Sequence, residues 1–100
     1  MSEARTLPAE LTIYTAAETH GVLMGWLAQD TSPGDWPVAA DGVNQIDAAG
    51  LQLIVALHRS LDARGQHLLL QGPHEALLNA MRSLGMDALL HQVVREGSPA

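Results

Sequence analysis

The chain has 100 residues, with eleven acidic residues against five arginines, no lysine, and a formal net charge of -6. This length suits one domain, and 47% apolar residues are enough to fill a core. The negative charge argues against binding to nucleic acids or anionic membranes. The absence of cysteine excludes disulfides, thiolate nucleophiles and zinc–thiolate sites.

Neither a targeting signal nor a membrane span is predicted. The first five residues hold one acid and one base, and no apolar segment follows them as it would in a signal peptide. The longest apolar run, Leu53–Leu57, is far shorter than the roughly 20 residues that cross a bilayer. We therefore expect a soluble cytoplasmic domain.

The first elements expected are a strand and a helix. Leu11–Tyr14 has the β-branched and aromatic content of a strand. Thr15 lies three residues before Glu18, the spacing of a capping box, which predicts that a helix begins there. The helix is expected to end near Gln29, because residues 31–35 are rich in turn formers.

The buried face of this first helix follows from its apolar spacing. Its glycines, Gly21 and Gly25, each cost about 1 kcal/mol relative to alanine, so tertiary packing must hold the helix. The His20 ring is expected to be buried and hydrogen-bonded to backbone. The residues expected to share the apolar face are Ala16, His20, Leu23 and Leu27.

The middle of the chain predicts a weak strand and a second helix. Trp36–Ala40 is a poor strand, in which proline is tolerable only at the first residue. After a connection over residues 41–45, Asp47 is a good N-cap for a helix. That helix is expected to run to about Arg64, with Gly65 as its left-handed terminator.

The last third of the chain predicts a buried strand and a third helix. Residues 67–71 form a short apolar run typical of a buried parallel strand. Pro73 is expected at the first helical position and Gly85 just after the end. Residues 86–95 are expected to add a short helix and a strand. The stripe expected on the third helix is Leu77, Met81, Leu84 and Ala88.

This order of strands and helices predicts the fold class. Alternating strands and helices are typical of βαβ units with right-handed crossovers. We therefore expect an α/β domain with a small, mostly parallel sheet of four to five strands and three to four helices.

Catalytic chemistry finds little support. The chain has no nucleophile elbow and no phosphate-binding loop, and the lack of lysine excludes a Schiff base. No two histidines have metal-ligand spacing. We expect no catalytic residue, no cofactor and no metal ion. The histidines considered are His20, His58, His67, His74 and His91.

The start of the second helix is the unusual feature. Ala48, Ala49 and Gly50 give it a tip with almost no side chains, although glycine is unfavourable in a helix. Either another macromolecule approaches the tip closely, or the helix packs tightly on a strand. The helix is also apolar on nearly every side over residues 51–57, so neighbouring helices or a partner protein must cover its far side.

At this point the sequence resembles a STAS domain, the family of anti-sigma factor antagonists. The resemblance covers about residues 5–92 and is strongest at Gly42–Leu53, where the family reads G-V-(T/S)-x-(I/M)-D-(S/T)-(S/A)-G-L. Ala63–Gly65 with the strand and Gly72-Pro73 after it, and Leu84–Asp87, agree as well. We expect one STAS-like domain over residues 1–100, with frayed ends at 1–4 and 97–100. The variant at residues 46–53 looks most like STAS proteins of chemotaxis-type systems.

The resemblance implies a non-enzymatic module that binds another protein. The implied partner is an anti-sigma factor, a switch kinase with a histidine-kinase-like ATPase fold, or a chemotaxis-type signalling protein. An alternative is an accessory STAS subunit that binds the ATPase of a lipid ABC transporter. No nucleic acid or membrane insertion is expected, and a homodimer is possible. The partner-binding residues implied are Asn44, Gln45, Asp47, Ala48, Ala49, Gly50, Leu51 and Ile54.

The chain departs from the family pattern where regulation occurs. Family members are commonly released by phosphorylation of the serine or threonine after the conserved aspartate, but here Ala48 and then Ala49 follow Asp47. Ala39 replaces an acidic residue usual in the preceding strand. We therefore expect no phosphorylation at position 48, and a domain that binds constitutively or is controlled by the abundance of its partner or by some other site. Leu51→Asp or Gly50→Arg is expected to abolish binding and leave the domain folded.

Overall fold

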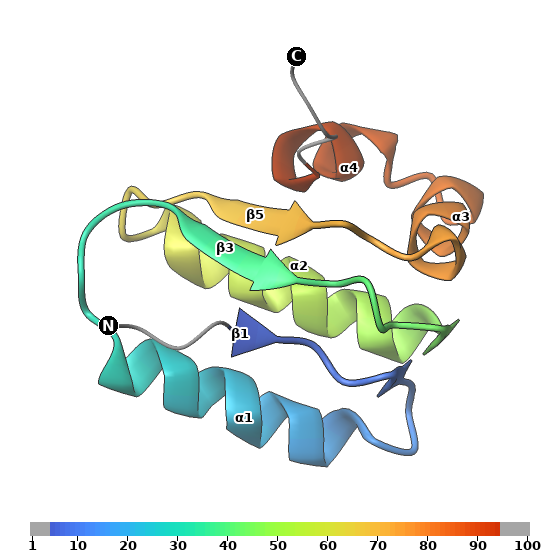
Figure 1. The fold of residues 1–100 in the computed structure, drawn as a ribbon, viewed down its shortest axis with the longest axis horizontal. Coiled ribbons are helices and arrows are strands. Elements are labelled where there is room, and N and C mark those ends of the chain that lie inside the picture. Colours follow the sequence, from blue (N-terminus) through green and yellow to red (C-terminus); the bar gives the residue numbers. More distant parts are fainter. Residues whose placement is uncertain (1–4, 95–100) are drawn as a thin grey trace.

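The computed structural model describes residues 5–94, so the ends expected to fray, 1–4 and 97–100, lie outside the described range. Within residues 5–94, four helices and five short strands follow one another as an α/β arrangement, which agrees with the expected fold class and helix number (Figure 1). The elements are β1 (Arg5–Thr6), β2 (Glu10–Leu11), α1 (Ala16–Gln29), β3 (Trp36–Ala39), β4 (Gln45–Ile46), α2 (Ala48–Asp62), β5 (Leu68–Gln71), α3 (Glu75–Ser83) and α4 (Asp87–Val93).

The strands form two small parallel sheets, and the expectation of one sheet with four to five strands is wrong. β1, β3 and β5 pair in that order, while β2 pairs only with β4. The first ladder ends where the Leu7 N–H donates to the Ala39 carbonyl at 3.0 Å. The partner chain turns away from β1 at residues 41–44, so the pairing resumes only at β2 and β4.

Helix α2 lies against one face of the three-stranded sheet, behind β3 and β5 in Figure 1, and α1 packs beside α2, below β1 in the same view. The residues of β3 and β5 alternate accordingly. Val38 and Leu70 are fully buried on the helix side, whereas Pro37 is exposed on the other side. At the far edge of β5, Val94 forms an isolated parallel bridge with Leu70 after α4. The short helix expected after residue 86 is present, and only this bridge represents the strand.

Pro37 is the second residue of a central strand, not the first. The N–H groups of Trp36 and Ala40 donate toward β5, so in a parallel ladder the nitrogen of Pro37 points toward β1. The described pairing with β1 begins one residue later, at Arg5 opposite Val38. The proline therefore removes no hydrogen bond of the described ladder.

The core lies between the sheet and helices α1 and α2, and it continues to the buried side chains of α3 and α4. α2 contributes its buried leucines and Ile54, and α1 packs beside it, so neighbouring elements cover most of this apolar helix. Ala56 is exposed on its outer side. The buried side chains form one cluster, and its α2 members are Leu51, Ile54, Leu57 and Leu61.

α1 begins and ends as predicted, but the segment before it does not. Only Leu11 of the expected strand Leu11–Tyr14 is in a strand, and the rest belongs to a turn in which the Thr15 N–H donates to the Thr12 carbonyl at 3.0 Å. The capping box is also absent, because the Thr15 hydroxyl donates to the Glu10 carbonyl at 3.0 Å. Hydroxyl groups that bond to nearby backbone favour turns over strands.

The buried face of α1 differs from the expected one. Thr19, Leu23 and Leu27 are buried at an i, i+4, i+8 spacing, while His20 is exposed. The expectation of a buried His20 ring is therefore wrong. The apolar pattern predicted the buried face of α1 only to within about one residue. Packing in the folded domain places Thr19, and not His20, on the buried side.

α3 starts later than predicted. Its N-cap is His74, whose Nδ1 accepts a hydrogen bond from the Ala76 N–H at 3.0 Å, so Pro73 precedes the helix. Gly85 terminates it with φ of 71° as expected. Of the expected stripe, Leu77 and Met81 are fully buried, whereas Leu84 and Ala88 are exposed, because the chain leaves the helix after Ser83.

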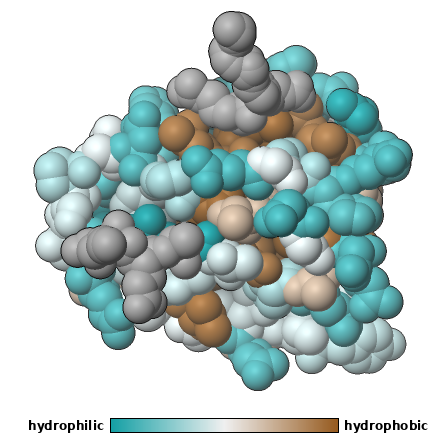
Figure 2. All heavy atoms as spheres, viewed as in Figure 1, coloured by the Kyte–Doolittle hydropathy of each residue, from teal (hydrophilic) through white to brown (hydrophobic). Residues whose placement is uncertain are grey.

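Hydrophilic side chains cover much of the face seen in Figure 2, and hydrophobic groups gather in its upper half, where β5 and α4 lie in Figure 1. Among residues 5–94, no helix has the length and apolar character needed to cross a membrane.

Candidate functional site

The start of α2 is held in place by one carboxylate. Asp47 is the N-cap, and its Oδ1 accepts from the Gly50 N–H at 3.0 Å. Its Oδ2 accepts from the Ile13 N–H, also at 3.0 Å, which ties α2 to the turn before α1. Hydrogen bonds from the N–H groups of Ile13 and then Gly50 hold the pKa of Asp47 below its ordinary value. The ionised side chain thus links the start of α2 to the turn before α1, and this link is called the Asp47 clasp.

Gly50 is explained by packing inside the domain. It is buried, and a Cβ at this position would lie 1.9 Å from the carbonyl oxygen of Leu11. The same carbonyl accepts from the Asp47 N–H at 3.2 Å. Of the two explanations left open by the sequence, close contact between helix and strand is the one observed.

The implied partner-binding residues separate into two groups. Asn44, Gln45 and Ala48 are exposed, and Asp47 and Ala49 are half-buried. Gly50, Leu51 and Ile54 lie in the core, with the two larger side chains each 1% exposed. In this conformation the last three residues support the tip from beneath and present no surface to a partner, so their direct contact is not expected.

The turn Thr12–Thr15 brings two apolar side chains to the tip, which sequence reasoning missed. Ile13 is 67% exposed and Tyr14 is 91% exposed. The turn is ordered by its threonines, because the Thr12 N–H donates to the Thr15 hydroxyl and the Tyr14 N–H to the Thr12 hydroxyl, both at 3.2 Å. Two threonines three residues apart were the available signal for a turn.

The exposed position of Ala48 decides what chemistry this tip can undergo. Ala48 lies at the surface directly after the Asp47 clasp, and Ala49 is half-buried. Neither side chain has a hydroxyl group. Ala39, the position at which the family pattern has an acid, is half-buried at the end of β3 and supplies no charge.

The histidines are dispersed over the fold. His20, His67 and His91 are exposed, and His74 caps α3. His58 is half-buried and its Nδ1 is enclosed without a hydrogen-bond partner. Within residues 5–94, no group of three or more histidine, cysteine, aspartate or glutamate side chains is placed to hold a metal ion.

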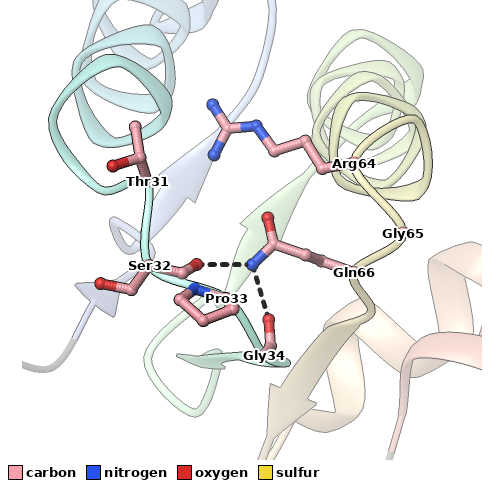
Figure 3. Close-up of a pocket in the computed structure, with 7 residues that line it drawn as sticks. All are labelled: Thr31, Ser32, Pro33, Gly34, Arg64, Gly65 and Gln66. Atoms are coloured by element: carbon pink, nitrogen blue, oxygen red, sulfur yellow. Dashed lines mark hydrogen bonds between the residues drawn. The ribbon is translucent and has the colours of Figure 1, made fainter.

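A hollow of about 480 Å³ lies at the opposite end of the strands, between the α1–β3 and α2–β5 connections (Figure 3). Gln66, 7% exposed, donates through Nε2 to the carbonyls of Ser32 and Gly34 at 2.8 and 2.7 Å. Arg64 donates to the carbonyls of Leu27 and Asp30 at 2.5 and 3.0 Å.

These bonds give the hollow a structural role. Arg64 places a positive charge at the C-terminus of α1, where α1 has no basic residue of its own and the helix dipole is negative. Beside it, the Arg5 guanidinium lies 3.8 Å from the centre of the Trp36 ring and forms an ion pair with Asp30. The side chains of Arg64 and Gln66 therefore hold the two connections together.

Comparison with known proteins identifies a similar fold and the family of the chain. A solved structure described as a sulfate transporter family protein from Wolinella succinogenes has a similar fold, with a TM-score of 0.71 and 24% identity over 92% of this chain and 75% of that chain. A search of curated proteins finds no match. The family model described as "Mlab, STAS domain" matches residues 6–93, which confirms the resemblance inferred from Gly42–Leu53. The chain belongs to this STAS family.

Proposed function

We propose that this protein is a non-enzymatic docking module that binds another protein through the tip of α2 and the turn beside it. STAS domains are in general regulatory modules that mediate protein–protein contacts. The surface proposed here is called the docking edge, and it consists of Ile13, Tyr14, Asn44, Gln45, Asp47, Ala48 and Ala49.

The observation that carries the proposal is the exposure of Ile13 and Tyr14 directly beside the Asp47 clasp. Large aromatic side chains supply much of the binding energy at protein interfaces. The turn that bears them is already fixed by hydrogen bonds, so little conformational entropy is lost on binding. Next to them, Ala48 has only a methyl group, so a partner can come close to the backbone at the start of α2.

The docking edge is proposed to lack a phosphorylation switch. A phosphate on the residue after Asp47 would add nearly two negative charges beside an ionised carboxylate, which is a physical reason for release in switched members. Ala48 has no acceptor oxygen. Binding is therefore expected to be constitutive and controlled by the amount of partner.

Two classes of partner are proposed, both in the cytoplasm. The resemblance at Gly42–Leu53 favours a signalling partner: an anti-sigma factor, a switch kinase or a chemotaxis-type protein. The alanine at position 48 favours the second class, the ATPase of a lipid ABC transporter, because a permanent accessory subunit requires no release switch. A homodimer remains a prediction that light scattering of the purified chain tests.

The test compares Ala48→Asp with Ala56→Asp, two substitutions of exposed alanines on the same helix. An acidic residue in the first turn favours the helix dipole, so Ala48→Asp should fold. Partners captured from the native cytoplasm by the wild-type chain are identified and purified, and their Kd is measured for each variant. We expect Ala48→Asp to weaken binding by about tenfold or more, since a charge must be buried without a partner.

Ala56→Asp should bind within error of the wild type. Equal binding by all three chains, or equal loss in both variants, would contradict docking at the tip. The captured protein separates the two classes, because an ABC ATPase supports the transport alternative and a histidine-kinase-fold protein supports signalling.

A further inference from the structure

We propose that a hollow beside the docking edge receives an arginine or lysine side chain of the partner protein. This inference rests on the proposed function and names the chemistry of the partner at one place. The hollow, called the acidic pocket, has a volume of about 350 Å³. Its walls include Pro8, Glu10, Glu18, Thr19 and Val22.

The acidic pocket is continuous with the docking edge. Thr15 lines the pocket and closes the turn that carries Ile13 and Tyr14. Its hydroxyl also donates to the carbonyl of Glu10, which fixes the turn relative to the pocket wall. The turn that bears Tyr14 is therefore joined directly to the wall of the pocket.

Two acidic residues from different elements line this pocket. Glu10 comes from β2 and Glu18 from the first turn of α1. Glu10 Oε2 accepts from the Thr12 hydroxyl at 2.6 Å, which leaves its other oxygen available. Two negative charges that line one small hollow repel each other unless a cation joins them.

No arginine of residues 5–94 supplies that cation. Arg5 forms its ion pair with Asp30, and Arg64 donates to carbonyls at the opposite end of the sheet. The remaining described arginines, Arg59 and Arg82, lie on α2 and α3 and do not line the pocket.

The rest of the pocket matches the other parts of a long basic side chain. Pro8 is exposed and Val22 is 47% exposed, so they offer apolar surface for a methylene stem. Thr19 is only 4% exposed and lines the pocket, and no hydrogen bond of its side chain is found within residues 5–94. Its hydroxyl can accept a hydrogen bond from an ammonium or guanidinium group.

The surrounding charge selects among possible occupants. The net charge of -6 repels phosphate groups, so a nucleic acid or an anionic membrane is unsuited to this surface. A basic segment of a protein is attracted by it, and the neighbouring Tyr14 adds apolar contact area that a small free amine would not use.

The experiment uses a defined peptide, acetyl-Leu-Arg-Leu-amide, and its neutral analogue in which citrulline replaces arginine. Both are titrated into the isotope-labelled full chain and followed by amide chemical shifts. We expect the arginine peptide to shift the amides of residues 6–22 most strongly and to bind about fivefold more tightly than the citrulline peptide, as a partly exposed ion pair allows.

Glu18→Gln is the main variant, because Glu18 lines the pocket and is exposed, so its substitution should leave the domain folded. It should lose most of the preference for arginine, and Glu10→Gln should add to the loss. Glu75→Gln is the matched control, since it removes one exposed carboxylate from the first turn of another helix. Equal affinity for the two peptides, shifts centred elsewhere, or an equal effect of Glu75→Gln would overturn the proposal.

The captured partner separates this inference from the proposed function. If Ala48→Asp weakens the partner and Glu18→Gln leaves its Kd unchanged, the docking edge stands and the acidic pocket is excluded. If the arginine peptide binds in the pocket while Ala48→Asp has no effect on the partner, docking at the helix tip is wrong, and the pocket alone binds cations.

Discussion

At the amino end of the strands, Arg64 and Gln66 donate hydrogen bonds to backbone carbonyls of the α1–β3 connection. At the carboxyl end the polarity is reversed, because the Asp47 carboxylate accepts from backbone N–H groups of two segments. Both ends are therefore fixed by side chains that satisfy the backbone.

The two ends differ in what they leave at the surface. None of the large exposed hydrophobic side chains of residues 5–94 lies in the α1–β3 or α2–β5 connection, whereas Ile13 and Tyr14 lie at the carboxyl end. At the amino end, Arg64 and Gln66 hold the α1–β3 connection against the α2–β5 connection, and this arrangement is called the closed joint. The turn held by the Asp47 carboxylate keeps Ile13 and Tyr14 exposed, which favours the carboxyl end for the proposed docking.

The largest expected effect comes from Leu51→Asp at the carboxyl end. Leu51 is 1% exposed, so the carboxylate would be buried without a partner, at a cost of about 4 kcal/mol or more. The burial of Leu51 therefore replaces the expectation from sequence, that this variant stays folded, with the prediction that it unfolds. Circular dichroism should show loss of the folded state or a strongly lowered Tm.

Gln52→Asp is the control for this variant, because Gln52 is exposed on the same helix. It should retain the wild-type spectrum. A folded Leu51→Asp with unchanged Tm would show that the tip of α2 is not packed as the structure describes.

A second pair of variants compares two helical glycines. Gly50→Ala places a Cβ against the Leu11 carbonyl and should destabilise the domain by about 2 kcal/mol, and Gly50→Arg should be worse. Gly25→Ala meets nothing within 4 Å and should stabilise the domain by about 0.5–1 kcal/mol through helix propensity. Urea unfolding of both variants gives the two free energies, and changes of the same sign would contradict this account.

These glycines also show how far the sequence could predict the structure. Local chemistry was sufficient for the Asp47 N-cap, the left-handed Gly65 and the strand before Gly72. It was insufficient for Gly50, because the contact with Leu11 joins segments that are almost forty residues apart and no local pattern reports it.

The candidate site was also predicted only in part, because local patterns indicate which residues begin a helix but do not report contacts between distant segments. Asn44, Gln45 and Ala48 lie at the surface as a docking role requires, since they precede or begin a helix. Tyr14 was assigned to a strand from its residue type, although threonine side chains hold it in a turn. Thr19 is buried and His20 is exposed because of how α1 packs in the folded domain, and the helical period alone does not determine this.

At the amino end, Gln66→Ala tests whether the closed joint depends on its donors. The substitution removes two hydrogen bonds, but the carbonyls of Ser32 and Gly34 lie in an exposed loop where water can replace them. We expect a loss of about 1 kcal/mol in the free energy of unfolding and no change in partner affinity. A change in partner affinity would mean that the two ends are not independent.

The smallest effect is expected from the pH dependence of the Asp47 clasp. Its pKa is lowered in the folded state, so the ionised form stabilises the fold fully above the ordinary pKa of about 3.9. That contribution is lost as the pH falls through the folded-state pKa. Asp47→Asn keeps one acceptor oxygen and loses the charge, so its Tm should lie below that of the wild type at pH values above about 5.

Thermal unfolding of the wild type and Asp47→Asn between about pH 3 and 7 measures this difference, which should narrow below about pH 4 as the wild-type carboxylate becomes protonated. Asp87→Asn provides a comparison, because Asp87 also lies in the first turn of a helix but makes no cap hydrogen bond with the backbone. A Tm difference for Asp47→Asn that persists unchanged to the lowest pH would mean that the geometry of the carboxylate, rather than its charge, ties α2 to the Tyr14 turn. The carboxyl end would then be held by hydrogen bonds that need no charge, whereas the amino end also relies on the charged Arg64.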